Sequence, residues 1–449
     1  MRHFCSFCCK KPFHQLITPT PNIDQREQQC NLEPKVDTKD SIDYLAKPSN
    51  VERVVLLYSG GLDTSVIVKY IQEEYDAEVV TLTLDLGQPG VDLESTKQKA
   101  LDIGAEKAFV LDVKEKFSEE FIAKSIKANG LYQGEYPLST AIARYLVCEK
   151  AVEVADKVDG DAIAHGATGK GNDQVRFEAG ILSLDPNIKL LAPVREWSMT
   201  RDKEHEYAEK HEIPVKASED SPYSTDENLW GKSSECGPLE DPNTEPPEDV
   251  FEFVTNPEKA PEEPEYIEIE FEEGVPKAIN DEELPLHELI EELNSIAGKH
   301  GVGIIDMMED RVVGLKSREV YECPAAVTLI EAHQELEKFV STKHENQFKA
   351  SVDQKWAKYA YNGLWFDPVM DHLEEFINSM NENVTGTVGL KLYKGSVHVT
   401  GRESDEALYD HELASYEEGE TFNQEASPGF IQLHSLQTKL SNEVNGGDE

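Results

Sequence analysis

The sequence predicts an α/β protein whose first domain is a doubly wound, mainly parallel sheet and whose second domain mixes α and β structure. From residue 51 to about 217, apolar strand-like runs alternate with helix-like segments, which is typical of a parallel sheet covered by helices on both faces. The first strand also runs into a glycine turn and then into a helix. Such sheets bind their ligands beyond the carboxyl ends of the strands.

The elements of the first domain follow from apolar patterning. Residues 54–56 form a continuous apolar run, which predicts a buried strand, and residues 65–75 carry apolar side chains at helical spacing. A second strand is expected at 79–84, followed by a helix at 93–103 that ends at Gly104, a usual helix stop. Further strands are expected at 108–111, 161–165 and 190–191, and further helices at 114–128 and from a cap at Thr200 to His211.

The second half of the chain begins with a segment rich in proline and acidic residues, 235–265, which predicts a loop or linker. Residues 265–271 alternate as a strand does, and 285–300 form an amphipathic helix. Residues 430–444 again carry apolar side chains at helical spacing, a face that docks either on its own domain or on another subunit. We therefore expect a leader at 1–50, the sheet domain at 51–217, a second domain at 218–410 and a tail at 411–449.

The chain is strongly acidic, with 449 residues, a net charge of −45 and a pI of about 4.6. Because binding to a nucleic-acid backbone needs a basic face, this composition argues against nucleic acid as the main partner. The acidic residues lie within segments of clear apolar periodicity, so we expect a folded protein with an acidic surface suited to a salt-rich, halophilic cytoplasm. No apolar run has the length of a membrane span and the N-terminus lacks a signal-peptide core, so we expect a cytosolic protein.

Residues 1–50 differ from the rest in composition. They contain seven Lys or Arg and six Asp or Glu, whereas the remaining 399 residues contain 36 and 82. Cys5, Cys8, Cys9 and Cys30 crowd there, but no second ligand pair completes a zinc site at the usual spacing, so no metal site is predicted. The leader is either disordered or translated sequence upstream of a true start near Val51, and the sequence does not decide between the two.

The segment 57–65, Leu-Tyr-Ser-Gly-Gly-Leu-Asp-Thr-Ser, predicts an anion site. Gly60 and Gly61 let the backbone approach a ligand, and the N–H groups at the start of the following helix face it. A Walker A loop would need a lysine after the glycines and a dinucleotide loop a third glycine, and neither is present. The remaining pattern resembles the pyrophosphate loop of enzymes that cleave ATP between its α and β phosphates.

A second segment, 164–178, predicts an amino-acid site. Its glycines clear space for a ligand, and Thr168, Lys170, Asn172, Asp173 and Arg176 supply both signs of charge and neutral donors. A zwitterionic amino acid suits this set, because its carboxylate binds Arg, Thr or Lys and its ammonium binds Asp.

Together the two segments resemble argininosuccinate synthase, a carbon–nitrogen ligase family with an ATP-pyrophosphatase nucleotide domain and an α+β synthetase domain. The resemblance runs from about Val51 to the C-terminus. The segment Thr-Gly-Lys-Gly-Asn-Asp-Gln-Val-Arg-Phe-Glu is highly specific, whereas the pyrophosphate loop is shared with GMP, NAD and asparagine synthetases and with tRNA-thiolating enzymes. Further matching motifs lie at 133–144, 191–197, 222–229, 301–303, 313–322 and 390–395.

The resemblance implies an enzyme that joins citrulline to aspartate in arginine biosynthesis or the urea cycle, through a citrullyl-adenylate. ATP, accompanied by Mg²⁺, is cleaved to AMP and pyrophosphate. No catalytic nucleophile is implied, because positioning the ligands and stabilising the departing pyrophosphate are enough. The resemblance also implies a homotetramer in which the tail helix reaches a neighbouring subunit.

The site residues are carried over by matching position. Those implied to bind ATP are Leu57, Tyr58, Ser59, Gly60, Gly61, Leu62, Asp63, Thr64, Ser65, Leu84 and Gly166. Those implied to bind citrulline are Tyr136, Asn172, Arg176, Ser224, Ser233, Glu309 and Tyr321. Those implied to bind aspartate are Thr168, Asn172 and Asp173.

The chain departs from the family pattern at several of these places. Ala141 stands where the family has a hydroxyl that contacts citrulline, and Ser139 or Thr140 is the candidate to replace it. Leu57 and Leu84 replace smaller residues, which is tolerable if only their backbone contacts ATP.

Asp310 and Glu319 stand where neutral residues are usual, and we interpret both as acidification of the surface.

Two other functions compete with the ligase. A tRNA thiolase would need a basic surface and a catalytic cysteine pair, whereas Cys148, Cys236 and Cys323 are isolated in an acidic chain. A non-catalytic nucleotide-binding module would not need the second segment, and AMP formation that depends on both amino acids would exclude it.

Overall fold

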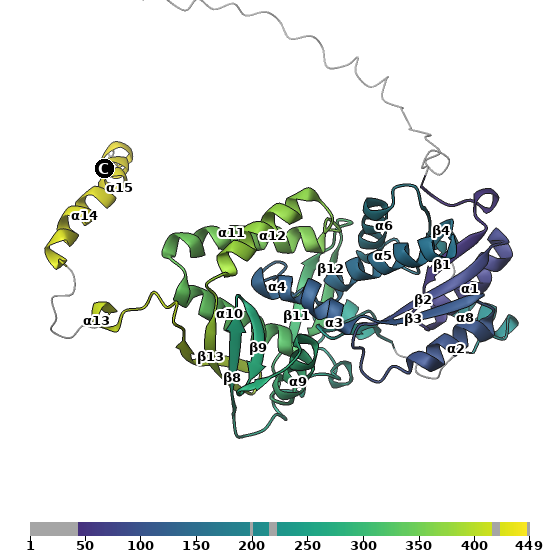
Figure 1. Ribbon diagram of the computed structural model, residues 1–449, viewed down its shortest axis with the longest axis horizontal. Helices are drawn as coiled ribbons and strands as arrows, with labels where there is room; N and C mark the ends of the chain where they lie inside the picture. Colours follow the sequence, from purple (N-terminus) through teal and green to yellow (C-terminus); the bar gives the residue numbers. More distant parts are fainter. Residues whose placement is uncertain (1–43, 198–200, 215–221, 415–422, 447–449) are drawn as a thin grey trace, which may run out of the picture. The chain divides into compact units, whose positions relative to one another are not determined.

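The computed structural model describes residues 44–197, 201–214, 222–414 and 423–446. Its N-terminal half is built on five parallel strands in the order β3-β2-β1-β4-β5, of which β1 to β4 are labelled in Figure 1. These strands are β1 (Arg53–Leu57), β2 (Glu78–Asp85), β3 (Lys107–Asp112), β4 (Ala162–Ala164) and β5 (Lys189–Leu191). All five predicted strands are confirmed, and the strand order reverses between β1 and β4, the position at which such sheets bind ligands.

Alternate residues of β1 face two different cores, which explains why the strand is continuously apolar. Val54 and Leu56 pack in the same core as Val66 of α1 (Leu62–Tyr75). Val55 and Leu57 pack in the other core, which contains the apolar residues of α5 (Ser139–Val158). Because successive side chains of a strand point to opposite faces, this arrangement confirms a sheet covered by helices on both sides.

The remaining helices of this half are α2 (Leu93–Ile103), α3 (Lys114–Phe117), α4 (Ala123–Lys127), α6 (Asp173–Leu184), α7 (Pro193–Trp197) and α8 (Arg201–Lys210). The helix at 93–103 is confirmed, and Gly104 ends it with a φ of 115°. Helix α1 begins at Leu62, directly after Gly61 and earlier than the predicted 65. The helix predicted at 114–128 is divided between α3 and α4 by a π-helical turn at Ser118–Ile122.

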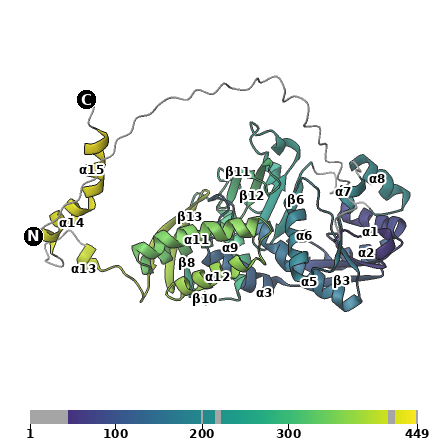
Figure 2. The ribbon, with the colours of Figure 1, turned by 90° about the horizontal axis from the view of Figure 1, so that it is seen from above.

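Helices α5 and α6 were not predicted, and they pack against each other (Figure 2). The first half of α5, up to Cys148, is buried at almost every position, so it has no amphipathic stripe that would identify it.

The second half contains two antiparallel sheets, with strand orders β10-β9-β8-β13-β14 and β11-β12-β7-β6. The first sheet holds β8 (Glu265–Glu272), β9 (Val275–Ile279), β10 (Glu282–Glu283), β13 (Gly386–Tyr393) and β14 (Ser396–Glu403). The second holds β6 (Ser224–Asn228), β7 (Gly231–Glu235), β11 (Ile304–Asp310) and β12 (Lys316–Glu322). This half of the chain also contains the helices α9 (Leu286–Lys299), α10 (Pro324–Val340), α11 (Lys343–Tyr361) and α12 (Pro368–Asn381). The predicted strand at 265–271 and helix at 285–300 are thus confirmed.

The predicted linker at 235–265 is mostly irregular, with 3₁₀ turns at Gly237–Glu240 and Glu248–Val250. The chain ends in α13 (His411–Ala414), α14 (Ser427–His434) and α15 (Leu436–Asn445), so the helix predicted at 430–444 is two helices that meet at Ser435. Shorter 3₁₀ turns lie at Pro48–Asn50 and Gln424–Ala426.

Several expectations lie outside the described residues, among them the four leader cysteines, the cap at Thr200 and the domain boundary at 217. The proposed division into domains therefore stays a prediction. None of the described helices combines the length and apolar character that crossing a membrane requires.

Candidate active site

The glycine turn after β1 leaves the start of helix α1 open to an anion. Gly60 has a φ of +82°, which side-chain-bearing residues rarely adopt, and Gly61 precedes the helix without a side-chain cap. The N–H groups of the first helical turn are the groups that bind phosphate in such turns. The hydroxyls of Ser59 and Thr64 lie 3.1 Å apart beside them. Lys99 of α2 fixes the turn, because its Nζ donates to the carbonyl oxygen of Gly60 at 2.8 Å.

The other residues predicted to bind ATP differ in what they can offer. The side chains of Leu57 and Leu84 lie in the core, so only their backbone is able to face a nucleotide. Gly166, at the end of β4, lies against the start of α1, since a Cβ at this glycine would be 3.4 Å from Thr64 Cγ2 and from Ile67 Cδ1. The structure therefore brings the predicted loops after β1 and β4 together.

At the start of α6, Asp173 lies between two guanidinium groups. Its carboxylate accepts hydrogen bonds from Arg144 Nε and Arg176 Nη1, both at 2.9 Å. Burial would raise the pKa of Asp173, but the charges of Arg144 and Arg176 lower it to about 2. Arg144 also pairs with Asp226 of β6. Asp173 is therefore ionised, and it fixes the orientation of Arg176.

Arg176 is almost fully buried and has one unsatisfied nitrogen. Its Nε donates to the backbone oxygen of Tyr361 at 3.0 Å, and its guanidinium carbon lies 4.7 Å from the centre of the Tyr361 ring. In contrast, Nη2 is buried without a hydrogen-bond partner. Because buried polar groups are normally paired, this nitrogen marks a place for an anionic group of a ligand, such as a carboxylate.

Glu309 of β11 is a buried carboxylate held by three donors. The hydroxyls of Tyr321 and Tyr361 donate to it at 2.8 Å and 2.6 Å, and Asn172 Nδ2 donates at 3.3 Å. Asn172 also donates to the Tyr361 hydroxyl at 2.7 Å and accepts the N–H of Val312 at 2.8 Å. We call Glu309, Tyr321, Tyr361 and Asn172 the Glu309 cluster. It joins α6, α11, β11 and β12 around one negative charge.

The sheet β11-β12-β7-β6 brings the remaining predicted citrulline residues to one face. Ser233 of β7 lies opposite Tyr321 of β12, and Glu309 reaches the same face through its hydrogen bond to Tyr321. On the next strand, Asp226 lies opposite Ser233, and Ser224 is two residues before it on the same side. Ser233 is half-buried, whereas Ser224 is exposed.

Tyr136 stacks on Tyr321 with ring centres 4.0 Å apart. Its hydroxyl is 3.0 Å from Thr140 Oγ1 and accepts the N–H of Ala141 at 3.3 Å. The Ser139 hydroxyl is buried without a hydrogen-bond partner. Of the two candidates to replace the hydroxyl missing at position 141, Thr140 is therefore the one whose hydroxyl forms a hydrogen bond with that of Tyr136.

The interpretation of Glu319 as surface acidification is wrong, because its side chain is buried. It pairs with Arg311 Nη2 at 2.6 Å, and Arg311 also binds Glu235. Burial, followed by the nearby charges of Glu235 and Glu309, raises the pKa of Glu319 well above its ordinary value. Asp310, in contrast, is exposed as expected.

Four residues of this arrangement were not predicted: Lys99, Arg144, Arg311 and Tyr361. Lys99 reaches the glycine turn from α2, and Tyr361 reaches Glu309 from the end of α11. Lys99, Arg311 and Tyr361 reach the site only through the packing of separate elements, so no local motif indicates them. Arg144 had a signal, because it ends the motif at 133–144 that resembles the family.

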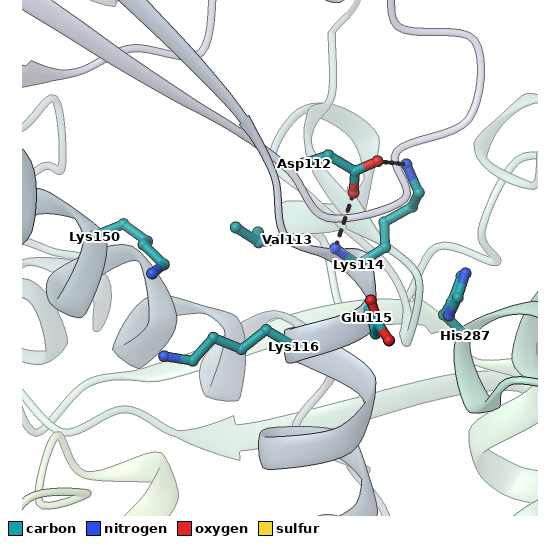
Figure 3. Close-up of a pocket in the computed structure, with 7 residues that line it drawn as sticks. All are labelled: Asp112, Val113, Lys114, Glu115, Lys116, Lys150 and His287. Carbon is teal, nitrogen blue, oxygen red and sulfur yellow. Dashed lines mark hydrogen bonds and ion pairs between the residues drawn. The ribbon is translucent and has the colours of Figure 1, made fainter.

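A separate pocket lies where β3 ends and α3 begins (Figure 3). It has a volume of about 330 Å³ and is lined by Asp112, Val113, Lys114, Glu115, Lys116, Lys150 and His287. Its lysines already bind carboxylates, Lys114 those of Asp85 and Asp112, Lys116 that of Glu149 and Lys150 that of Glu153. Their charges are thus compensated, and none of the predicted site residues lines this pocket. Within the described part of the chain, no three His, Cys, Asp or Glu side chains are grouped to hold a metal ion.

Comparison with known proteins finds matches over both halves of the chain. The arginosuccinate synthase N-terminal HUP domain matches residues 53–214, and the arginosuccinate synthase C-terminal domain matches residues 223–441. The argininosuccinate synthase of Pyrococcus furiosus is 56% identical over 389 residues, which cover 87% of this chain and 94% of that protein. Those of Oceanobacillus iheyensis and Rubrobacter xylanophilus are 51% and 52% identical over 88% of this chain, and the matches cover 94% and 96% of those proteins.

Proposed function

The chain belongs to the argininosuccinate synthase family, and on that premise we propose how its residues carry out the reaction. It is an AMP-forming carbon–nitrogen ligase that joins citrulline and aspartate to argininosuccinate in arginine biosynthesis, with ATP as the third substrate. The match over both halves favours the ligase over the thiolase and the non-catalytic module. One observation carries the proposed site: an unsatisfied guanidinium nitrogen and a buried carboxylate lie in one network, as a zwitterionic substrate requires.

In this proposal, citrulline binds with its carboxylate on Arg176 and its ammonium on Glu309. The free Nη2 of Arg176 supplies the donor, and Tyr321 and Tyr361 hold Glu309 in place. Asn172 belongs to the same cluster, and Tyr136, Ser224 and Ser233 line the sheet face along which the rest of citrulline extends.

ATP binds in this proposal with its phosphates at the turn 57–65, where the open start of α1 and the hydroxyls of Ser59 and Thr64 supply donors. The backbone of Leu57, Leu84 and Gly166 completes the contact. Mg²⁺ accompanies ATP, and the carboxylate of Asp63 beside the turn is a ligand of the kind that this ion accepts.

The chemical steps need positioned substrates rather than a nucleophilic side chain. The ureido oxygen of citrulline attacks the α-phosphorus of ATP, and pyrophosphate leaves with its charge stabilised at the glycine turn. The amine of aspartate then attacks the ureido carbon, and AMP leaves. We assign aspartate to Thr168, Asn172 and Asp173. Thr168 is exposed on the loop after β4, whereas Asp173 also holds Arg144 and Arg176.

We also propose that α14 and α15 join the subunits of a homotetramer. Their apolar side chains, including Phe430, Ile431, Leu433 and Val444, are 60–78% exposed in the single chain. Exposed apolar residues gathered on terminal helices are typical of interfaces. The mass of the protein in solution, compared between the full chain and Phe430→Asp, tests this assignment.

The acidic surface is proposed to adapt the enzyme to high salt, since net charge of −45 repels itself unless it is screened. Melting temperatures measured from low salt to molar KCl should rise steeply. A melting temperature that does not change with salt would contradict this part of the proposal.

The reaction is tested by pyrophosphate release from ATP, measured with purified full-length protein in molar KCl. Citrulline and aspartate are supplied singly and together, and we expect release only with both, or slow release with citrulline alone. Arg176→Lys should raise the KM for citrulline while leaving the KM for ATP within twofold. Folded protein that releases no pyrophosphate would contradict the assigned reaction.

A further inference from the structure

Residues just before the family match add a parallel segment to the edge of the main sheet. The match begins at residue 53, whereas Leu45 forms a parallel bridge with Leu190 of β5. The N–H of Ala46 donates to the Leu190 oxygen, and the N–H of Leu190 donates to the Tyr44 oxygen, both at 2.9 Å. Ala46 is buried in the same core as Val54 and Leu56 of β1. Strand β5 is the edge of this sheet, and without this segment the N–H and the carbonyl oxygen of Leu190 would have no backbone partner.

The side chain of Tyr44 extends this contact into the neighbourhood of the substrate loop. Its hydroxyl donates to Glu178 Oε2 of α6 at 3.2 Å. Glu178 is largely buried and pairs with Arg195. Burial would raise the pKa of Glu178, but the hydrogen bond of His165 and the charge of Arg195 hold it below its ordinary value. Glu178 is therefore an ionised acceptor for several donors at once.

From Glu178 two chains of hydrogen bonds lead to the loop after β4. In the first, the fully buried His165 lies with Nε2 3.2 Å from Glu178 Oε1, and its Nδ1 accepts the N–H of Ala167 at 3.2 Å. These two bonds select the tautomer with the proton on Nε2. Ala167 directly precedes Thr168.

In the second chain, Arg195 is the link. Its Nη2 binds Glu178, and its Nη1 donates to Gln174 Oε1 at 3.1 Å. Gln174 Nε2 in turn donates to the carbonyl oxygens of Gly169 and Gly171, at 2.6 Å and 3.3 Å. The glycine-rich loop 166–171 is thus held at both ends by side chains that converge on Glu178.

We propose that Tyr44 is a positioning residue for the loop 166–171, so that residues before the family match serve the binding of aspartate. The identity of the ligand rests on the proposed function, which assigns Thr168 of this loop to aspartate. The hydroxyl of Tyr44 supplies one of the donors that hold Glu178. When this donor is lost, Glu178 is free to shift, and with it His165 and Arg195, which fix the loop.

The experiment replaces Tyr44 by Phe in the full chain, which keeps the ring and removes only the hydroxyl. We expect the KM for aspartate to rise about threefold to tenfold, the effect of losing one ordinary net hydrogen bond, because His165 and Arg195 still hold Glu178. The kcat and the KM values for citrulline and ATP should stay within twofold. Tyr266→Phe is the matched control, because Tyr266 is 62% exposed on β8 in the other half of the chain.

Two further measurements separate positioning from general stability and from the assignment of the ligand. Hydrogen exchange of peptides covering 166–171 should be faster in Tyr44→Phe than in Tyr266→Phe, at equal melting temperatures. In a Glu178→Ala background, Tyr44→Phe should change the KM for aspartate by less than about 1.5-fold, since the acceptor is gone.

Unchanged exchange in the loop would overturn the proposal, whatever the kinetics. Faster exchange with an unchanged KM for aspartate would support the positioning role and count instead against the assignment of aspartate to this loop. An equal effect of Tyr44→Phe with and without Glu178 would also overturn it, because Tyr44 would then act by another route.

Discussion

The two halves of the site are built in opposite ways. The turn assigned to ATP is one contiguous segment, 57–65, and it offers mainly backbone groups and small hydroxyls. The face assigned to citrulline is assembled from α6, α11, β7, β11 and β12, and its side chains bind one another before any ligand arrives. The first half therefore depends on backbone shape, whereas the second depends on a network of charges and hydroxyls.

This difference sets what each half tolerates. In the turn, an added methyl group changes the shape on which the phosphate contacts depend, whereas a change of surface charge nearby leaves the backbone in place. In the citrulline half, a substitution that keeps the shape but removes one charge replaces an acceptor oxygen by a donor and leaves at least one buried donor without an acceptor. A substitution that changes only the shape should therefore impair mainly the ATP turn. A substitution that changes only the charge should impair mainly the citrulline face.

The largest expected effect follows from Gly60→Ala. A Cβ at this position would lie 2.8 Å from Thr96 Cγ2, at a φ of +82°. Either the turn or the buried Thr96 must shift, and we expect kcat/KM for ATP to fall by about 100-fold or more, as when a preorganised donor is lost. Gly314→Ala is the control, since Gly314 has a φ of +85° with no neighbouring atom within 4 Å. If both variants lose the same activity, backbone strain rather than the shape of the turn is responsible.

The next effect is expected from Glu309→Gln, which keeps the shape of the side chain and removes its charge. Citrulline would lose the partner of its ammonium, and kcat/KM for citrulline should fall by about 10- to 100-fold, the range for a hydrogen bond to a charged group. The KM for ATP should change little. Asp310→Asn, one residue further along at an exposed position, should have less than a twofold effect. Equal losses in the two variants would contradict the role of the Glu309 cluster.

The same contrast explains what could be predicted from the sequence. The turn at 57–65 and the loop at 164–178 are contiguous, so their chemistry is visible in a short string of residues. The strands of the parallel sheet were visible too, because β1 must be apolar on both faces. Tyr361 and Arg311 were not visible, since they join the site only when α11 and the β11–β12 hairpin pack against it. Glu319 was misjudged for the same reason, because burial depends on neighbours that are distant in the chain.

A smaller effect, on stability, is expected from Asp173→Asn. The native pKa of about 2 lies below the ordinary 3.8, so the ionised carboxylate stabilises the fold above about pH 4. This contribution is lost as the pH falls from about 4 to about 2, because the carboxylate is then protonated. We expect the variant to melt about 2–4 °C below the wild type at pH 7, with the gap closing below pH 4. A gap that stays constant with pH, or one matched by the exposed Asp405→Asn, would contradict this account.

The smallest effect is expected from Ala141→Ser, which restores the hydroxyl usual in the family. Thr140 already contacts the Tyr136 hydroxyl at 3.0 Å, and the N–H of Ala141 donates to the same oxygen at 3.3 Å. We therefore expect the KM for citrulline to fall by less than about threefold, less than one net hydrogen bond would give. Thr140→Val should raise this KM, and by more in wild type than in Ala141→Ser, because the restored serine then supplies the hydroxyl. If Thr140→Val has no effect in either background, Tyr136 needs no second hydroxyl, and the departure at position 141 is neutral because the Glu309 cluster already fixes citrulline.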